Sequence, residues 1–164
     1  MNTGAPFYKI ILMTVVIFAA CTKDKSYVYE VNKVTVQQPG SVKTNAKTTI
    51  EFISIAYSHL FGTTITNDRL VKINAAYSSF GDKKLMEDRI IRNFLNDPSA
   101  VIPAEPAMRA NLSQFVTDTY KKFLNRDPNA MEKYFLSNLI QNDTSIKPDM
   151  VYYSFMTSNE YRYY

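Results

Sequence analysis

The sequence predicts an all-α protein in which two tandem three-helix units pack as one helical bundle, preceded by a cleaved signal peptide and an extended tether. Three observations lead to this prediction. From Thr48 onward, apolar residues recur with a helical period of three and four residues. The pattern of residues 48–98 returns in residues 111–164. The chain has only 4 glycines, which disfavours a turn-rich β-sandwich.

Composition and charge exclude some classes of function. A chain of 164 residues with 46% hydrophobic content is long enough to bury one substantial core. The formal net charge of +4 is too small for a dedicated polyanion groove, so we expect no nucleic-acid partner. Tyrosine and phenylalanine are plentiful, and we expect those at helical spacing to belong to the core.

Residues 1–20 have the order of a secretory signal peptide. Lys9 supplies a positive charge, residues 10–18 form an apolar run, and two alanines place small side chains before Cys21. The run is about half of the roughly 20 apolar residues that a membrane-spanning helix needs. We therefore expect a lipoprotein signal peptide that is removed.

Cys21 is the only cysteine, so it has no partner for an internal disulfide. Its setting resembles the lipobox of bacterial lipoproteins, with Phe18 where that family usually has leucine. The resemblance implies that Cys21 is the first mature residue and is acylated, with chains of the palmitate type. Each buried methylene contributes about 0.8 kcal/mol, so several chains on one residue give stable anchoring to the membrane.

The residues after Cys21 predict a tether and an address. Residues 21–47 are polar, and the β-prone stretch 27–36 within them has no partner strand. Lys23 and Asp24 resemble a short charged signal that directs lipoproteins of Bacteroidota to the cell surface. A solvated tether is usually charged as well, so the cell surface and the periplasmic face of the outer membrane both stay open. The expected location is the cell envelope.

The first helical unit is predicted over residues 48–98. Its second helix begins after Thr66 and its third after Asp82, both of which are good N-cap residues. Three apolar stripes at helical spacing define its helices: Phe52, Ile53, Ala56, Tyr57, Leu60 and Phe61; Leu70, Val71, Ile73, Ala76 and Tyr77; Leu85, Met86, Ile90, Ile91, Phe94 and Leu95.

Residues 99–110 are predicted as a proline-rich linker, and residues 111–164 as the second helical unit. Asn111 is the expected first N-cap of this unit, and Asp127 the second, with Pro128 at the first helical position. The last helix is expected to begin at Pro148. The expected stripes are Phe115, Val116, Thr119, Tyr120, Phe123 and Leu124; Met131, Tyr134, Phe135, Leu139 and Ile140; Val151, Tyr152, Phe155 and Met156.

The second unit resembles the helical module of phycobilisome linker polypeptides and of related bacterial surface-layer proteins. The resemblance covers about fifty residues and is carried by nine of them in order: Phe115, Tyr120, Leu124, Arg126, Pro128, Phe155, Ser158, Glu160 and Tyr161. The first unit has "FGTTIT" in place of the Arg-x-Pro turn. The resemblance implies a non-catalytic, protein-binding scaffold; pigment association is not carried over.

Chemistry-bearing motifs point away from catalysis. His59 is the single histidine, without metal spacing, and is expected to be half-buried and hydrogen-bonded. The sequence contains no glycine-rich phosphate loop and no serine nucleophile elbow. Glu87 and Asp88 are adjacent and diverge on a helix. We expect no enzyme activity, no cofactor and no metal.

Five residues are candidates for contact with a partner: Arg126, Glu160, Tyr161, Tyr163 and Tyr164. Arg126 and Glu160 are expected to pair across the turn and the last helix, and the terminal tyrosines to be exposed. The favoured hypothesis is a membrane-anchored lipoprotein that acts as a helical adaptor and binds another envelope protein. The alternative is a surface lipoprotein that binds carbohydrate through exposed tyrosines.

We predict that a fatty-acid probe labels the wild-type protein in cells but not the Cys21→Ser variant, because the thiol is the acylated atom. The measurement is detection of the probe on the purified protein. Adding Ser26→Cys to the Cys21→Ser variant is not expected to restore labelling, since that thiol lies outside the lipobox. Equal labelling of wild type and Cys21→Ser would contradict the assignment.

Overall fold

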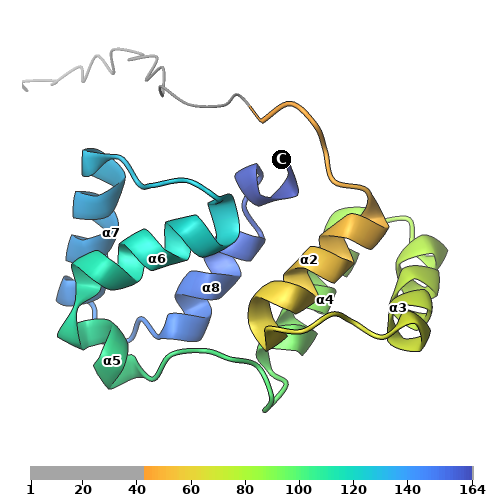
Figure 1. The fold of residues 1–164 in the computed structure, drawn as a ribbon, viewed down its shortest axis with the longest axis horizontal. Coiled ribbons are helices and arrows are strands. Elements are labelled where there is room, and N and C mark those ends of the chain that lie inside the picture. The colour runs from red at the N-terminus through yellow and green to blue at the C-terminus, as the bar shows by residue number, and fades with distance from the viewer. Residues whose placement is uncertain (1–42, 164) are drawn as a thin grey trace, which may run out of the picture. The chain divides into compact units, whose positions relative to one another are not determined.

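The computed structural model describes residues 43–163, and this part of the chain is all-helical, as the sequence predicts (Figure 1). The predicted signal peptide, Cys21 and Tyr164 lie outside the described residues. None of the described helices is long and apolar enough to cross a membrane. The helices are α2 (Thr49–Phe61), α3 (Asn67–Ser79), α4 (Lys83–Leu95), α5 (Glu105–Ala110), α6 (Leu112–Leu124), α7 (Ala130–Asn142), α8 (Pro148–Met156) and the 3-10 turn η1 (Glu160–Arg162).

Local caps define most of the helix starts. The Thr48 hydroxyl accepts from the Glu51 amide while the Glu51 carboxylate accepts from the Thr48 amide, which completes a capping box. Thr66 and Asp82 accept from the amides three residues on, as predicted. Asn111 caps α6 in the same way. Each side-chain oxygen satisfies an amide that has no partner inside its helix.

Helices α2 and α6 both end in a residue of left-handed conformation. Gly62 follows α2 with φ 67°, and Asn125 follows α6 with φ 53°. Glycine pays no steric penalty there, and asparagine is one of the few other residues that tolerate this conformation. Both helices contain 13 residues.

One hydrophobic core connects the helices. α2 packs against α3 and α4, α6 packs against α5, α7 and α8, and α4 packs against α8. The buried members form a single cluster: Phe52, Ile53, Ala56, Leu60, Tyr77, Ile90, Ile91, Phe94, Met108, Phe115, Val116, Phe123, Leu124, Ile140, Val151, Tyr152, Met156 and Tyr161. The stripes predicted for α2, α4, α6 and α8 supply most of these residues, since their apolar period matches the helix.

Three local expectations differ from the structure. The segment predicted as a linker contains α5, where Pro106 occupies an early helical position at which it needs no amide. Asn129, rather than Asp127, caps α7 and forms a capping box with Glu132. Pro128 therefore precedes the helix and does not occupy its first position. The Asp127 carboxylate instead forms an ion pair with the Lys121 ammonium at 3.1 Å.

The end of the predicted tether is also part of the folded domain. Ala46 forms an isolated antiparallel bridge with Tyr163, and the Lys47 amide donates to the Arg162 carbonyl at 2.9 Å. The Lys47 side chain is buried. The sequence alone does not reveal this pairing of residues 46–47 with residues 162–163, because the two segments lie more than a hundred residues apart.

The stripe predicted for α7 is wrong in its orientation. Only Ile140 of that set is buried, whereas Met131, Tyr134, Phe135 and Leu139 are exposed. α3 packs against both α2 and α4, but the principal packing partner of α7 is α6. With one partner, α7 buries the face that carries Ile140 and leaves the opposite apolar face uncovered.

In each half of the fold one tyrosine links two helices. The Tyr57 ring stacks on Phe61 at 4.2 Å and meets Phe94 edge-on at 5.5 Å. The Tyr120 ring meets Phe155 edge-on at 4.8 Å. Both tyrosines are partly buried and pack against the core cluster.

We predict that Tyr57→Ala and Tyr120→Ala each lower the free energy of unfolding by about 2–4 kcal/mol, slightly less than for a fully buried aromatic residue. The two costs are expected to add, because the tyrosines contact different rings. Tyr134→Ala, at an exposed site, is the control and is expected to change stability by about 0.5 kcal/mol or less. Chemical denaturation compares wild type, the three single variants and the Tyr57→Ala/Tyr120→Ala double variant. Two separate unfolding transitions would contradict the shared core.

Candidate functional site

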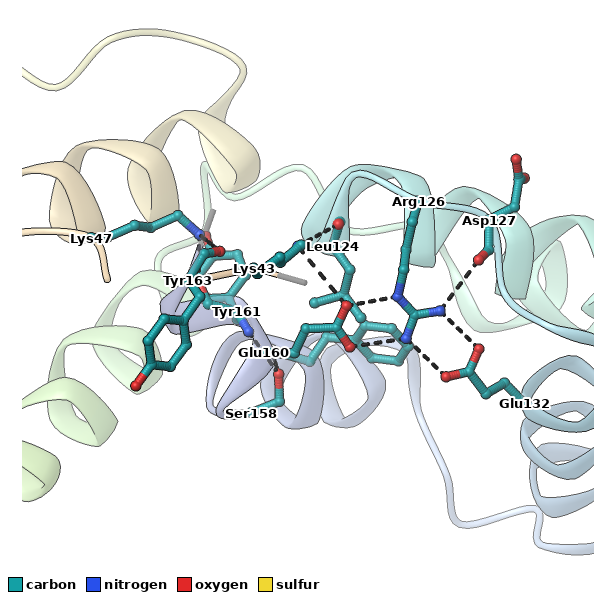
Figure 2. Close-up of polar contacts among 11 residues, drawn as sticks. Lys43, Lys47, Leu124, Arg126, Asp127, Glu132, Ser158, Glu160, Tyr161 and Tyr163 are labelled. Carbon is teal, nitrogen blue, oxygen red and sulfur yellow. Dashed lines mark hydrogen bonds and ion pairs between the residues drawn. The ribbon is translucent and has the colours of Figure 1, made fainter. Parts of the chain in front are cut away.

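Arg126 is the centre of an ion-pair network that joins the turn after α6 to α7 and to the C-terminal turn η1 (Figure 2). Its Nε and Nη2 donate to the two carboxylate oxygens of Glu160 at 2.6 and 2.9 Å. Its Nη1 and Nη2 donate to the carboxylate of Glu132, each at 2.8 Å. The predicted Arg126–Glu160 pair is thus confirmed, and Glu132 is a second partner that the sequence did not indicate.

The geometry of this network favours a structural role for Arg126. Only 17% of the Arg126 side chain is exposed, and its guanidinium is occupied by two bidentate pairs. The hydrogen bonds from Glu160 and Glu132 raise the pKa of Arg126 above its ordinary value. The guanidinium also lies 4.9 Å from the centre of the Tyr120 ring. Little of this group is left for a binding partner.

Tyr161 is buried, so the expectation that it is exposed for a partner is wrong. Its ring meets Phe52 of α2 at 5.9 Å and Phe123 of α6 at 6.1 Å, both edge-on. Burial raises the pKa of its hydroxyl well above the usual range. The short turn η1 directs this side chain inward. The stretch "NEYRYY" is too short to show a periodic pattern of apolar residues, so the sequence does not predict which of its side chains is buried.

His59 is half-buried and hydrogen-bonded, as predicted. Its Nδ1 lies 3.1 Å from the Tyr161 hydroxyl. Burial, with a smaller contribution from the nearby ammonium groups of Lys122 and Lys47, lowers the pKa of His59 to about 4. The imidazole is therefore neutral at pH 7, and its role is to satisfy a buried hydroxyl.

Two lysines hold the start of the folded domain against its end (Figure 2). The Lys47 ammonium donates to the carbonyls of Tyr161 and Tyr163 at 2.5 and 3.2 Å. Burial lowers the pKa of Lys47 to about 8. Lys43 donates to the Leu124 carbonyl at 2.5 Å and lies 3.9 Å from Glu160. These contacts fasten the C-terminal turn to the chain that enters α2.

Among the candidate partner residues, Tyr163 is 38% exposed and remains accessible. Arg126, Glu160 and Tyr161 are brought together, but as parts of the folded domain. Within residues 43–163 no group of three metal-binding side chains is found.

The exposed surface that the sequence did not predict is an apolar stripe on α7. It consists of Met131, Tyr134, Phe135 and Leu139, whose exposed fractions lie between 44% and 73%. Their spacing places them on one face of the helix. All exposed residues of α7 are uncharged, since Glu132 and Lys133 are only partly exposed. An apolar patch of this kind typically marks an interaction site. We call it the α7 stripe.

Comparison of the chain with protein-family models, with curated proteins and with solved structures finds no match.

We predict that Arg126→Met lowers the free energy of unfolding by about 2–3 kcal/mol, because it leaves the carboxylates of Glu132 and Glu160 without their shared cation. The cost is expected to stay below that of a fully buried pair, as both carboxylates are partly exposed.

Lys121→Met is the matched control, since its pair with Asp127 is largely exposed. It is expected to change stability by about 1 kcal/mol or less. Equal denaturation midpoints for Arg126→Met and wild type would contradict the structural role.

Proposed function

We propose that this protein is a membrane-anchored lipoprotein that acts as a non-catalytic helical adaptor in the cell envelope, with the α7 stripe as its protein-binding surface. The observation that carries the proposal is the exposure of four large apolar side chains on one helical face. Such a face is costly to leave in water and is unusual in a monomeric soluble domain. The lipid anchor at Cys21 would hold the adaptor at the membrane.

We also infer that the fold contains two copies of one three-helix unit, α2–α4 and α6–α8. Three pairs of matching features, each 63 residues apart, support the inference. Thr48 and Asn111 are N-caps of equally long helices, and so are Thr66 and Asn129; Gly62 and Asn125 are the left-handed residues that end α2 and α6.

The repeat provides an internal comparison for the α7 stripe. The positions of Met131, Phe135 and Leu139 correspond to Asp68, Lys72 and Ala76 of α3 at an offset of 63. Asp68 and Lys72 form an exposed ion pair at 2.8 Å, which is ordinary solvated surface. The fourth position, Tyr134, corresponds to Val71, which is exposed as well. Because α3 carries charges at the positions of Met131 and Phe135, the fold does not require apolar residues at these two positions. Binding of a partner explains these exposed apolar residues of α7 better than a requirement of the fold does.

The chemistry of the stripe favours one kind of partner, an amphipathic helix of another envelope protein. Apolar side chains at i, i+3, i+4 and i+8 on a 13-residue helix suit packing of a second helix along the ridge. The exposed residues of α7 carry no charge, so the contacting face of the partner must be apolar as well. Tyr134 adds a rigid side chain whose hydroxyl can stay at the rim.

The carbohydrate-binding alternative has less support. It relied on exposed terminal tyrosines, and Tyr161 is buried. Tyr163 keeps some exposure, and its backbone carbonyl accepts a hydrogen bond from the Lys47 ammonium. We therefore retain the adaptor as the proposed function.

We predict that a variant carrying Met131→Asp, Phe135→Lys and Leu139→Ala, which copies the α3 surface onto α7, loses binding of the envelope partner. Its thermal stability is expected to stay close to wild type, since changes at exposed positions cost about 0.5 kcal/mol or less each. Val71→Ser on α3 is the control and is expected to retain binding.

The measurement is photo-cross-linking in cells, with a photoreactive residue in place of Tyr134 or, as a control, Val71. The expected result is an adduct only from position 134, mapped by mass spectrometry to an amphipathic helix of one envelope protein. An adduct to a second copy of the chain, to lipid, or to nothing at all would overturn the adaptor proposal.

A further inference from the structure

A cavity of about 400 Å³ lies beside α6, away from the residues of the α7 stripe. Its walls come from α5, α6, α8 and the segment before α5. The residues that line it are Val101, Ile102, Pro103, Ala107, Met108, Asn111, Gln114, Phe115, Asp118, Thr119, Lys122 and Tyr152. The volume is within the range of small-molecule sites, which are mostly apolar with a few polar groups.

The floor of this cavity is formed by buried, mostly apolar side chains. Met108 is fully buried, and the rings of Phe115 and Tyr152 lie parallel at 6.2 Å between centres. Thr119 is buried too, but its hydroxyl donates to the Phe115 carbonyl and so adds no free polar group. A ligand body that touches these walls must therefore be apolar.

Among the described residues that line the cavity, Lys122 is the only cationic one. Its ammonium lies 4.9 Å from the centre of the Tyr152 ring and 5.6 Å from that of Phe123. In the part of the chain from Lys43 to Tyr163 it makes neither a hydrogen bond nor an ion pair. Burial lowers the pKa of Lys122, which is the usual consequence of desolvating an ammonium group that lacks a counter-charge.

The nearest acidic residue on the same helix does not neutralise this lysine. Asp118 lies one turn before Lys122, at a spacing that ordinarily forms an ion pair. The Asp118 carboxylate instead accepts from the Gln114 amide at 2.8 Å. Asn111 uses its side-chain oxygen to cap α6, which leaves its amide N–H groups available at the same rim.

We propose that this cavity binds a small monocarboxylate with an aromatic or branched apolar body, its carboxylate on the Lys122 ammonium and its body against Met108, Phe115 and Tyr152. A single negative charge fits better than two, because Asp118 at the rim repels a dianion such as phosphate. The carboxylate can accept further hydrogen bonds from the Asn111 amide. The proposal does not depend on the α7 stripe and can fail or hold without it.

The test uses the full chain in phospholipid nanodiscs, labelled with carbon-13 at the methionine methyl groups. The probe is phenylacetate, and phenylacetamide is the neutral control of the same shape. Met108 reports on the cavity, whereas Met131 on α7 reports on nonspecific effects. We expect a saturable shift of the Met108 signal with phenylacetate, an unchanged Met131 signal, and binding of phenylacetamide that is about tenfold weaker or more.

Two variants test the role of the charge. Lys122→Met keeps the apolar stem and is expected to weaken phenylacetate binding about tenfold or more, while Lys122→Arg is expected to retain most of it. Lys121→Met, the neighbouring exposed lysine, is the matched control and should bind as wild type does. Circular dichroism confirms that each variant is folded.

Three outcomes would overturn the proposal. Absence of a Met108 shift at millimolar phenylacetate would exclude the site. Equal binding of phenylacetate and phenylacetamide would reduce it to an apolar cavity without selectivity for the anion. Lys122→Met is the uncharged variant, and Lys122→Gln replaces it should Lys122→Met not fold. If the folded uncharged variant binds phenylacetate as tightly as wild type does, Lys122 is not part of the site.

Discussion

Burial of Tyr161 between α2 and α6 is the interaction on which the rest of the fold depends. Its ring contacts Phe52 and Phe123, and its hydroxyl meets His59, so one side chain joins the two halves of the core. The residues on either side extend this role: Glu160 pairs with Arg126, and Arg162 pairs with Glu87 of α4 at 3.0 Å. Three consecutive side chains thus fasten the C-terminal turn to three separate elements.

This fastening explains how the two halves can differ in their outer surfaces. The core is continuous through the α4–α8 contact and through Tyr161, so stability is shared by both halves. α3 and α7 lie at the outside, and α7 has a single principal packing partner. A helix held mainly from one side can expose an apolar face without loss of the core, and that face is then available for binding.

The stripe on α7 and the cavity beside α6 differ in chemistry. The stripe is apolar and uncharged, and we propose that it binds a helix of another protein. The cavity instead has a lysine ammonium against aromatic walls. Both lie in the second half of the fold, where the Arg126 network holds the turn between α6 and α7. At an offset of 63 residues from the stripe, α3 has the Asp68–Lys72 ion pair, Val71 and Ala76.

The sequence by itself determined the helical class and most helix starts, because caps and apolar periods are interactions between residues close in the chain. The Arg126–Glu160 pair is the one long-range contact that was expected, since its members are 34 residues apart. The sequence did not determine which face of α7 is buried, since that helix has apolar residues on both faces and the choice depends on what packs against it. Nor did it place Tyr161 inside, pair Ala46 with Tyr163, or assemble the cavity around Lys122. These features join residues far apart in sequence, so only the tertiary structure decided them.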